Sequence, residues 1–195
     1  MLFPKRWLMS FALLIGLTAV AASEVPGRFT GQAMLVPLKD GRNMQLVKPF
    51  GYIDPQGQAW PVPAGATTDG ASIPRMLWIT HPPFTGKYRL AAVVHDYYCQ
   101  QRSRGWKETH KVFYDAMRTS GVPEQTAKVM YGAVYRFGPR WGPQSERTAT
   151  HLKQQLNLEK QLRFVRELTA WIKRDNPSPE EIGEVLDAGN IPNPK

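Results

Sequence analysis

The spacing of apolar residues divides the chain into a strand-like part and a helical part. From Gly27 to Pro63, short apolar runs alternate with turn sequences: "FTGQAMLVPL" and "MQLVKPFGYI" are separated by "KDGRN", and "DPQGQ" precedes "AWPVP". The Asp40-Gly41 pair is a turn signal, and apolar runs of this length are typical of strands. This part of the chain therefore predicts a small antiparallel sheet of about three strands.

After residue 87 the apolar positions recur at the three- and four-residue spacing of a helix face. Three helices are predicted, over Tyr88–Arg102, Trp106–Thr119 and Pro123–Phe137. Gly121 is placed to cap the second of these helices, and Pro123 is well placed at the start of the third. Because the connection "SRGW" is short, the first two helices should fold back as an antiparallel hairpin.

The C-terminal part continues the helical pattern with more charge. Residues 145–173 predict one long amphipathic helix or two short ones, packed on the domain or on a partner, and the last 21 residues hold one further short helix. The predicted fold class is α+β: an N-terminal antiparallel sheet, a helical hairpin and further C-terminal helices. The expected organisation is a leader at 1–22, a core at 27–140 and an amphipathic extension at 144–195.

The first residues predict export. Lys5 and Arg6 precede an uncharged run from Trp7 to Ala22, which ends in the small residues of "AVAAS". A run of that length is short for a spanning helix, which needs about 20 apolar residues. We expect a signal peptide cleaved near Ala21 to Ser23, no integral membrane segment in the mature chain, and a periplasmic or secreted location.

Charge and cysteine content narrow the classes of partner. The formal net charge of +9 favours anionic surfaces, so anionic lipid and cell-wall polymers are the expected partners, while export argues against nucleic acid. A basic protein without such a partner is the plain alternative. Cys99 is the only cysteine, which excludes an intrachain disulfide, and on an apolar helix it is expected to be a small core residue.

The stretch "AAVVHDYYCQQ" places His95 and Asp96 in the middle of a predicted buried helix. On the second helix, His110 lies one turn before Phe113 and is therefore turned inward, so a closed hairpin brings His95 and His110 face to face. Two inward histidines beside a carboxylate must be hydrogen-bonded, protonated against a partner, or bound to metal. The simplest interpretation is a polar network that ties the hairpin to the preceding loop.

That loop, "TTDGASIPR", has the chemistry of a tight turn followed by a helix start. Gly70 permits a left-handed conformation, Asp69 can accept backbone N–H bonds, and Ser72 with Pro74 resembles a capped first helical turn. A polar loop before a helix that carries His and Asp is also a way to build an oxygen-ligated cation site. Asp69 and Asp96 are therefore candidate metal ligands.

The motifs "VPAGATTDGASIPRMLW", "AAVVHDYYCQQ", "HKVFYDAMRTSGV" and "YGAVYRFG" resemble the domain of unknown function 1353 family of bacteria and phages. The resemblance covers about Thr30 to Gly138 and implies no established activity. A weaker similarity is to secreted phospholipases A₂, which implies His95 as general base, Asp96 as a Ca²⁺ ligand and His110 in the orienting position. His110 departs from the carboxylate expected there, and the disulfides of that class are absent.

Three hypotheses of function remain open from the sequence. The first is a Ca²⁺-assisted, phospholipase A₂-like hydrolase with His95 and His110 as catalytic residues. The second is a Zn²⁺-dependent cell-wall amidase or peptidase, in which His95, His110 and either Asp69 or Asp96 bind the ion and leave one position for water. The third is a non-catalytic envelope-binding or structural module.

Overall fold

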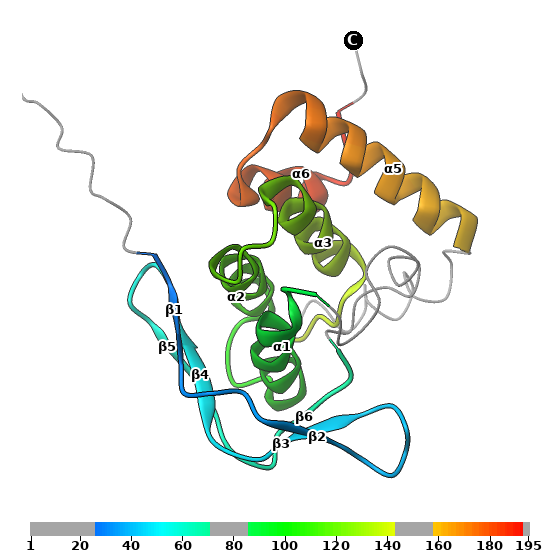
Figure 1. Ribbon diagram of the computed structural model, residues 1–195. Coiled ribbons are helices and arrows are strands. Elements are labelled where there is room, and N and C mark those ends of the chain that lie inside the picture. Colours follow the sequence, from blue (N-terminus) through cyan, green and yellow to red (C-terminus); the bar gives the residue numbers. More distant parts are fainter. Residues whose placement is uncertain (1–25, 71–85, 143–157, 193–195) are drawn as a thin grey trace, which may run out of the picture.

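The computed structural model describes residues 26–70, 86–142 and 158–192 (Figure 1). Within these ranges the chain forms strands first and helices afterwards, as an α+β fold. The strands are β1 (Arg28–Thr30), β2 (Leu35–Pro37), β3 (Met44–Leu46), β4 (Phe50–Ile53), β5 (Ala59–Val62) and β6 (Thr67–Thr68). The helices are α1 (Arg89–Gln101), α2 (Trp106–Thr119), α3 (Glu124–Phe137), α5 (Leu158–Asp175) and α6 (Pro179–Ala188).

Among the described residues the strands pair as two three-stranded antiparallel sheets, in the orders β1-β4-β5 and β2-β3-β6. The two sheets share one register. The residue six positions before Leu35 is Phe29, and the residue six positions after its partner Leu46 is Tyr52; these two residues are also paired. The predicted three runs therefore form one three-stranded meander that is bent across its middle, so that each run contributes a strand to both sheets.

The bend falls where glycine and proline interrupt the runs. Gly31 has a φ of +76°, and a Cβ added there would lie 2.9 Å from the carbonyl oxygen of Pro49 on the neighbouring run. Pro49 has no N–H to donate, so the ladder is broken there from both sides. Pro63 and Gly65, the latter with a φ of +88°, interrupt the third run between β5 and β6. The small antiparallel sheet of about three strands predicted from the sequence is thus present as two three-stranded sheets.

The predicted helices are confirmed with small changes at their ends. The helix α2 has the predicted bounds, and Gly121, with a φ of +78°, follows its last residues as expected. The helix α6 begins at a complete capping box, in which Ser178 and Glu181 bind each other's backbone N–H groups. The amphipathic segment is one helix, α5, over its described part, while its first residues and the predicted leader lie outside the described ranges.

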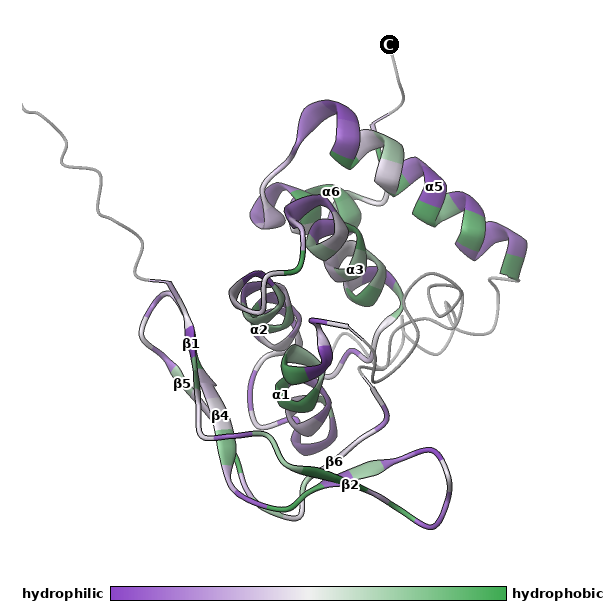
Figure 2. Cartoon of the chain, viewed as in Figure 1, coloured by the Kyte–Doolittle hydropathy of each residue, from purple (hydrophilic) through white to green (hydrophobic). Residues whose placement is uncertain are grey.

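The helices α1 and α2 both lie next to the sheets, α3 packs on α2, and α5 and α6 lie on the far side of α3 (Figure 1). Buried apolar residues of all five helices form one core with the strands. In Figure 2, hydrophobic residues of α5 lie on the side that faces α3, and hydrophilic residues lie on its outer side. None of the described helices has both the length and the apolar content that crossing a membrane requires. The α1–α2 hairpin therefore lies at the centre of the molecule, between the sheets and the remaining helices.

Candidate metal centre in the helical hairpin

The hairpin brings His95 and His110 into direct contact, as the sequence predicts. Nε2 of His95 lies 3.0 Å from Nδ1 of His110. Both residues are 0% exposed. Small residues make this approach possible, because Ala91 and Ala92 precede His95 on α1 and Gly138 packs beside the ring of His110. A Cβ added at Gly138 would lie 3.2 Å from Cε1 of His110 and would collide with the carbonyl oxygen of Val134.

Cys99 is the third member of this cluster. It is buried, as predicted for a core residue, and its thiol is free. Because it lies four residues after His95, its Sγ comes within 3.4 Å of His95 Nε2. One donor atom from each of His95, Cys99 and His110 lies within 4.8 Å of the other two. The four-residue spacing was visible in the sequence, but it did not distinguish a ligand from a packed thiol.

The two carboxylate oxygens of Asp96 have different neighbours: Oδ2 faces the loop after β6, and Oδ1 faces His95. Its Oδ2 accepts hydrogen bonds from the Thr68 hydroxyl at 2.6 Å and from the Asp69 backbone N–H at 3.2 Å. Its Oδ1 lies 3.6 Å from Nδ1 of His95. Asp96 thus joins the end of β6 to the histidine pair, which is the tie between hairpin and loop expected from the sequence.

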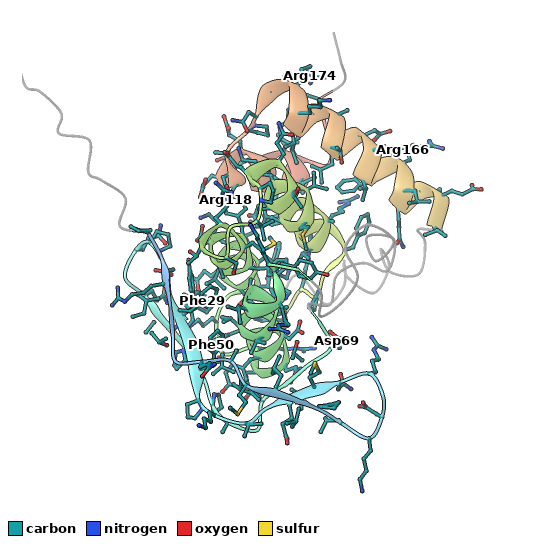
Figure 3. The ribbon with its side chains drawn as sticks, viewed as in Figure 1. Phe29, Phe50, Asp69, Arg118, Arg166 and Arg174 are labelled. Atoms are coloured by element: carbon teal, nitrogen blue, oxygen red, sulfur yellow. The ribbon has the colours of Figure 1, made fainter. Side chains whose placement is uncertain are left out.

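The Asp69 carboxylate lies outside the donor cluster. Its Oδ2 accepts from the Arg42 guanidinium at 3.0 Å on the partly exposed side of the loop after β6 (Figure 3). Gly70 adopts the predicted left-handed conformation with a φ of +92°, and its N–H donates to the Thr68 hydroxyl at 3.1 Å. The other two predicted turn residues, Ser72 and Pro74, lie outside the described ranges.

The two imidazoles have opposite proton affinities because their neighbours differ. Burial lowers the pKa of His95, but the negative charges of a Cys99 thiolate and of the Asp96 carboxylate outweigh burial and raise this pKa to about 10. Burial lowers the pKa of His110 well below its usual value, and the positive charges of His95 and Arg140 lower it further. In the metal-free protein we therefore expect His95 to be protonated and to donate from Nε2 to Nδ1 of neutral His110.

This tautomer leaves a proton on Nε2 of His110. That nitrogen has no well-formed hydrogen bond within the described residues, although the Pro139 backbone lies close enough to raise the pKa slightly. Aromatic rings cover the cluster: Phe113 lies 4.9 Å from His95 and Trp106 lies 5.6 Å from His110, measured between ring centroids. The donors therefore lie in an environment shielded from water, where a polar group that lacks a hydrogen-bond partner lowers the stability of the fold.

The donor set fits Zn²⁺ better than Ca²⁺. Tetrahedral zinc with Zn–N near 2.1 Å and Zn–S near 2.3 Å places two ligand nitrogens about 3.4 Å apart, and a nitrogen and a sulfur about 3.6 Å apart. The 3.0 Å between the two histidine nitrogens and the 3.4 Å from sulfur to nitrogen are close to that arrangement. Ca²⁺ takes six to eight oxygen ligands, and the clustered donors here are two nitrogens and one sulfur.

The fold and this cluster define an α+β domain built around a buried His–His–Cys centre. The model of the family described as "Protein of unknown function (DUF1353)" matches residues 44–134, a segment that contains all three donors. The family resemblance noted from the sequence is thereby confirmed, and this segment belongs to that family. The similarity to secreted phospholipases A₂ is not borne out.

Two similar proteins come from the bacterium Sinorhizobium fredii. The uncharacterized protein y4iH is 47% identical over 120 residues, which is 58% of this chain and 48% of that protein. The uncharacterized protein y4jT is 43% identical over 141 residues, which is 70% of this chain and 42% of that protein. The matches thus span less than half the length of either relative. No solved structure matches this chain.

Proposed function

We propose that the protein is a zinc-binding module in which His95, Cys99 and His110 hold one Zn²⁺ and the ion fastens α1 to α2. The observation that carries this proposal is the convergence of three buried donor atoms within 4.8 Å of one another. The two histidines are 0% exposed and Cys99 is 8% exposed, so the ion acts from inside the core. Binding to the folded state alone would stabilise the fold.

Zinc binding would change the protonation of the histidine and cysteine ligands. Zinc requires neutral imidazoles and a thiolate, so His95 would lose its proton from Nε2, and Cys99 would bind through a deprotonated Sγ. Nε2 of His95 and Nδ1 of His110, which lie 3.0 Å apart, would then both serve as ligands to the ion. The metal thereby offsets the cost of placing these polar groups in an apolar core.

Asp96 has a supporting role in this proposal in place of the direct ligand role considered from the sequence. Ligand histidines usually donate their second ring N–H to a carboxylate or a carbonyl, which fixes the tautomer and the ring orientation. Asp96 Oδ1 lies 3.6 Å from Nδ1 of His95, so a shift of about 0.5 Å would bring the two atoms to hydrogen-bond distance. Its other oxygen is held by Thr68 and Asp69, so the carboxylate is itself fixed.

A second candidate is a zinc-dependent hydrolase acting on cell-wall amides. It is favoured by the number of protein donors, because three ligands leave a fourth position for the water that catalytic zinc activates. The complete burial of both histidines favours the structural role over this one. In either case, the leader predicted from the sequence would place the protein in the periplasm or outside the cell.

Metal analysis of the purified protein tests the proposal. We expect about one Zn²⁺ per chain, a lower melting temperature after chelation, and a thiolate-to-metal charge-transfer band when Co²⁺ replaces Zn²⁺. Cys99→Ala and His110→Ala should lose the metal and become insensitive to chelator. Thr109→Val is the matched control, because the Thr109 hydroxyl is buried next to His110 without a hydrogen bond among the described residues.

Two results would decide against this assignment. Metal-free protein whose melting temperature is unaffected by added Zn²⁺ or by chelator would overturn zinc binding. Zinc-dependent cleavage of peptidoglycan fragments, abolished in His110→Ala and retained in Thr109→Val, would replace the structural role with the hydrolase.

A further inference from the structure

The large apolar side chains exposed in the described residues gather at two places. Met34, Val36 and Val47, which are 42%, 42% and 44% exposed, lie on the β2–β3 hairpin, and we call them the hairpin patch. Leu158 and Leu162 lie at the start of α5. The hairpin extends away from the helices (Figure 1), so its outer face has no covering element among the described residues.

Strand pairing places the three side chains of the hairpin patch on one face. The Val47 N–H donates to the carbonyl oxygen of Met34 at 2.8 Å, so these two residues are opposite each other across the ladder. Val36 lies two residues after Met34 and therefore projects to the same side. The opposite face carries Leu46, which is 1% exposed and belongs to the core. The patch therefore points outward because the other face of the hairpin packs inward.

The hairpin is held in a fixed conformation. The Asp40 carboxylate accepts from the backbone N–H groups of Arg42 and Asn43 at 2.9 and 2.8 Å, which fixes the turn. The Arg42 guanidinium binds Asp69 across 27 positions of sequence and ties the turn to the loop after β6. A patch presented on a fixed support loses little conformational freedom when it binds.

Two exposed lysines lie just beyond the strands that carry the hairpin patch. Lys39 follows β2 and Lys48 follows β3, and both are exposed. Neither has an ion pair with any residue that the structure describes. The nearby Asp40 carboxylate is engaged in the turn, and Arg42 is engaged with Asp69. The hairpin thus carries an exposed apolar patch and two exposed lysines that have no ion pair among the described residues, within a chain of net charge +9.

We propose that the hairpin patch binds the surface of an anionic phospholipid bilayer. Met34, Val36 and Val47 would enter the boundary between headgroups and acyl chains, while Lys39 and Lys48 contact lipid phosphates. Reversible membrane binding generally needs both an apolar and an electrostatic contribution, and this hairpin supplies both. The start of α5 fits less well, because Glu159 lies in the same groove as Leu162, Arg163 and Arg166.

Co-sedimentation of the metal-replete full chain with lipid vesicles tests this surface. Binding is expected to phosphatidylglycerol-rich vesicles, to fall with added salt, and to be weak on pure phosphatidylcholine. The triple variant Met34→Ser, Val36→Ser, Val47→Ser should bind about tenfold more weakly or worse. Lys39→Ala and Lys48→Ala should each weaken binding to the anionic vesicles about fivefold at low salt.

The matched control is the double variant Leu158→Ser, Leu162→Ser, which removes the other exposed apolar pair and should bind like the wild type. Circular dichroism shows whether each variant keeps its fold, and the lysine variants change only exposed side chains. Equal loss in the α5 control, or no binding to anionic vesicles, overturns the proposal. Concentration-dependent dimers that are abolished by the patch substitutions, without vesicle binding, would assign this face to a second copy of the chain.

Discussion

His95 and His110 differ in proton affinity because their neighbouring charges differ. Nε2 of His95 and Nδ1 of His110 are 3.0 Å apart and both residues are fully buried, so desolvation alone would make both rings hard to protonate. His95 has the negative charges of a Cys99 thiolate and the Asp96 carboxylate beside it and binds a proton strongly, whereas His110 has cations beside it and does not. This asymmetry makes the pair a donor and an acceptor, and it avoids two repelling imidazolium ions.

Asp115 is a second buried charge, and it gives a pH dependence that can be measured. Its carboxylate is 8% exposed and binds Lys111 Nζ at 2.8 and 3.0 Å. Burial raises the pKa of Asp115 above the usual 3.8, and Lys111 only partly offsets this effect. Since the folded state then holds this proton more tightly than the unfolded state, ionisation of Asp115 costs stability.

We therefore predict that the contribution of Asp115 to the free energy of unfolding falls as pH rises from about 3.8 through its elevated folded pKa, and then levels off. Asp115→Asn removes this titration. Urea unfolding of both proteins across acidic pH, with the variant curve subtracted from the wild-type curve, isolates the effect from other carboxylates. A difference that stays flat or increases with pH would contradict the prediction.

At the residue scale, the sequence predicted which histidines meet but not the complete donor set. Helical spacing was enough for His95 and His110, because both positions are fixed by local periodicity and by a short connection. Cys99 was predicted to be buried, and it is, but its distance from His95 depends on side-chain rotamers. The Asp69 carboxylate pairs with Arg42, which is 27 residues away, and no local pattern determines such a contact.

At the element scale, the sequence predicted the three extended segments of the sheet. It did not predict the bend that divides each segment into two strands. Periodicity identifies the extended segments and the turns between them. Where a sheet bends is decided by the close approach of neighbouring runs, here Gly31 against the carbonyl of Pro49. The bend turns β6 towards α1, and this contact brings Thr68 to Asp96.

The junction between β6 and α1 predicts a specific loss of stability. Thr68 is 2% exposed, and its hydroxyl donates to Asp96 at 2.6 Å while it accepts from the Gly70 N–H. Thr68→Val keeps the shape but leaves a buried carboxylate oxygen with fewer donors, which should cost about 1–3 kcal/mol. Urea denaturation of the metal-free protein gives the change directly.

The adjacent threonine is the control for that experiment. Thr67 lies on the partly exposed side of the same strand, and its hydroxyl makes only a 3.5 Å contact with Gln100. Thr67→Val should therefore change the free energy of unfolding by no more than about 0.5 kcal/mol. Equal effects at the two positions would show that the Thr68–Asp96 bond does not hold β6 against α1.

At the scale of the whole molecule, the C-terminal helices share a core with the rest of the chain. Buried residues of α5 and α6 belong to the same apolar cluster as those of α1, α2 and α3. The contact with α3 is close: a Cβ added at Gly132 would lie 2.7 Å from the Leu168 side chain. Lys128 of α3, 3% exposed, binds the Asn176 side chain at the end of α5 with a 2.7 Å hydrogen bond.

This shared core predicts that the chain ending at residue 142 cannot keep its native packing. The shortened chain lacks five buried side chains, namely Leu168, Trp171, Ile172, Ile182 and Leu186. At about 1.5–3 kcal/mol for each, the loss is comparable to the whole stability of an ordinary domain, about 5–15 kcal/mol. We expect the near-ultraviolet circular dichroism to be lost and hydrophobic dye to bind, while a chain ending at Pro192 unfolds like the full protein. A cooperative transition of the shortened chain at the wild-type midpoint would mean that residues 27–140 fold alone, and that α5 and α6 only cover a core that is already complete.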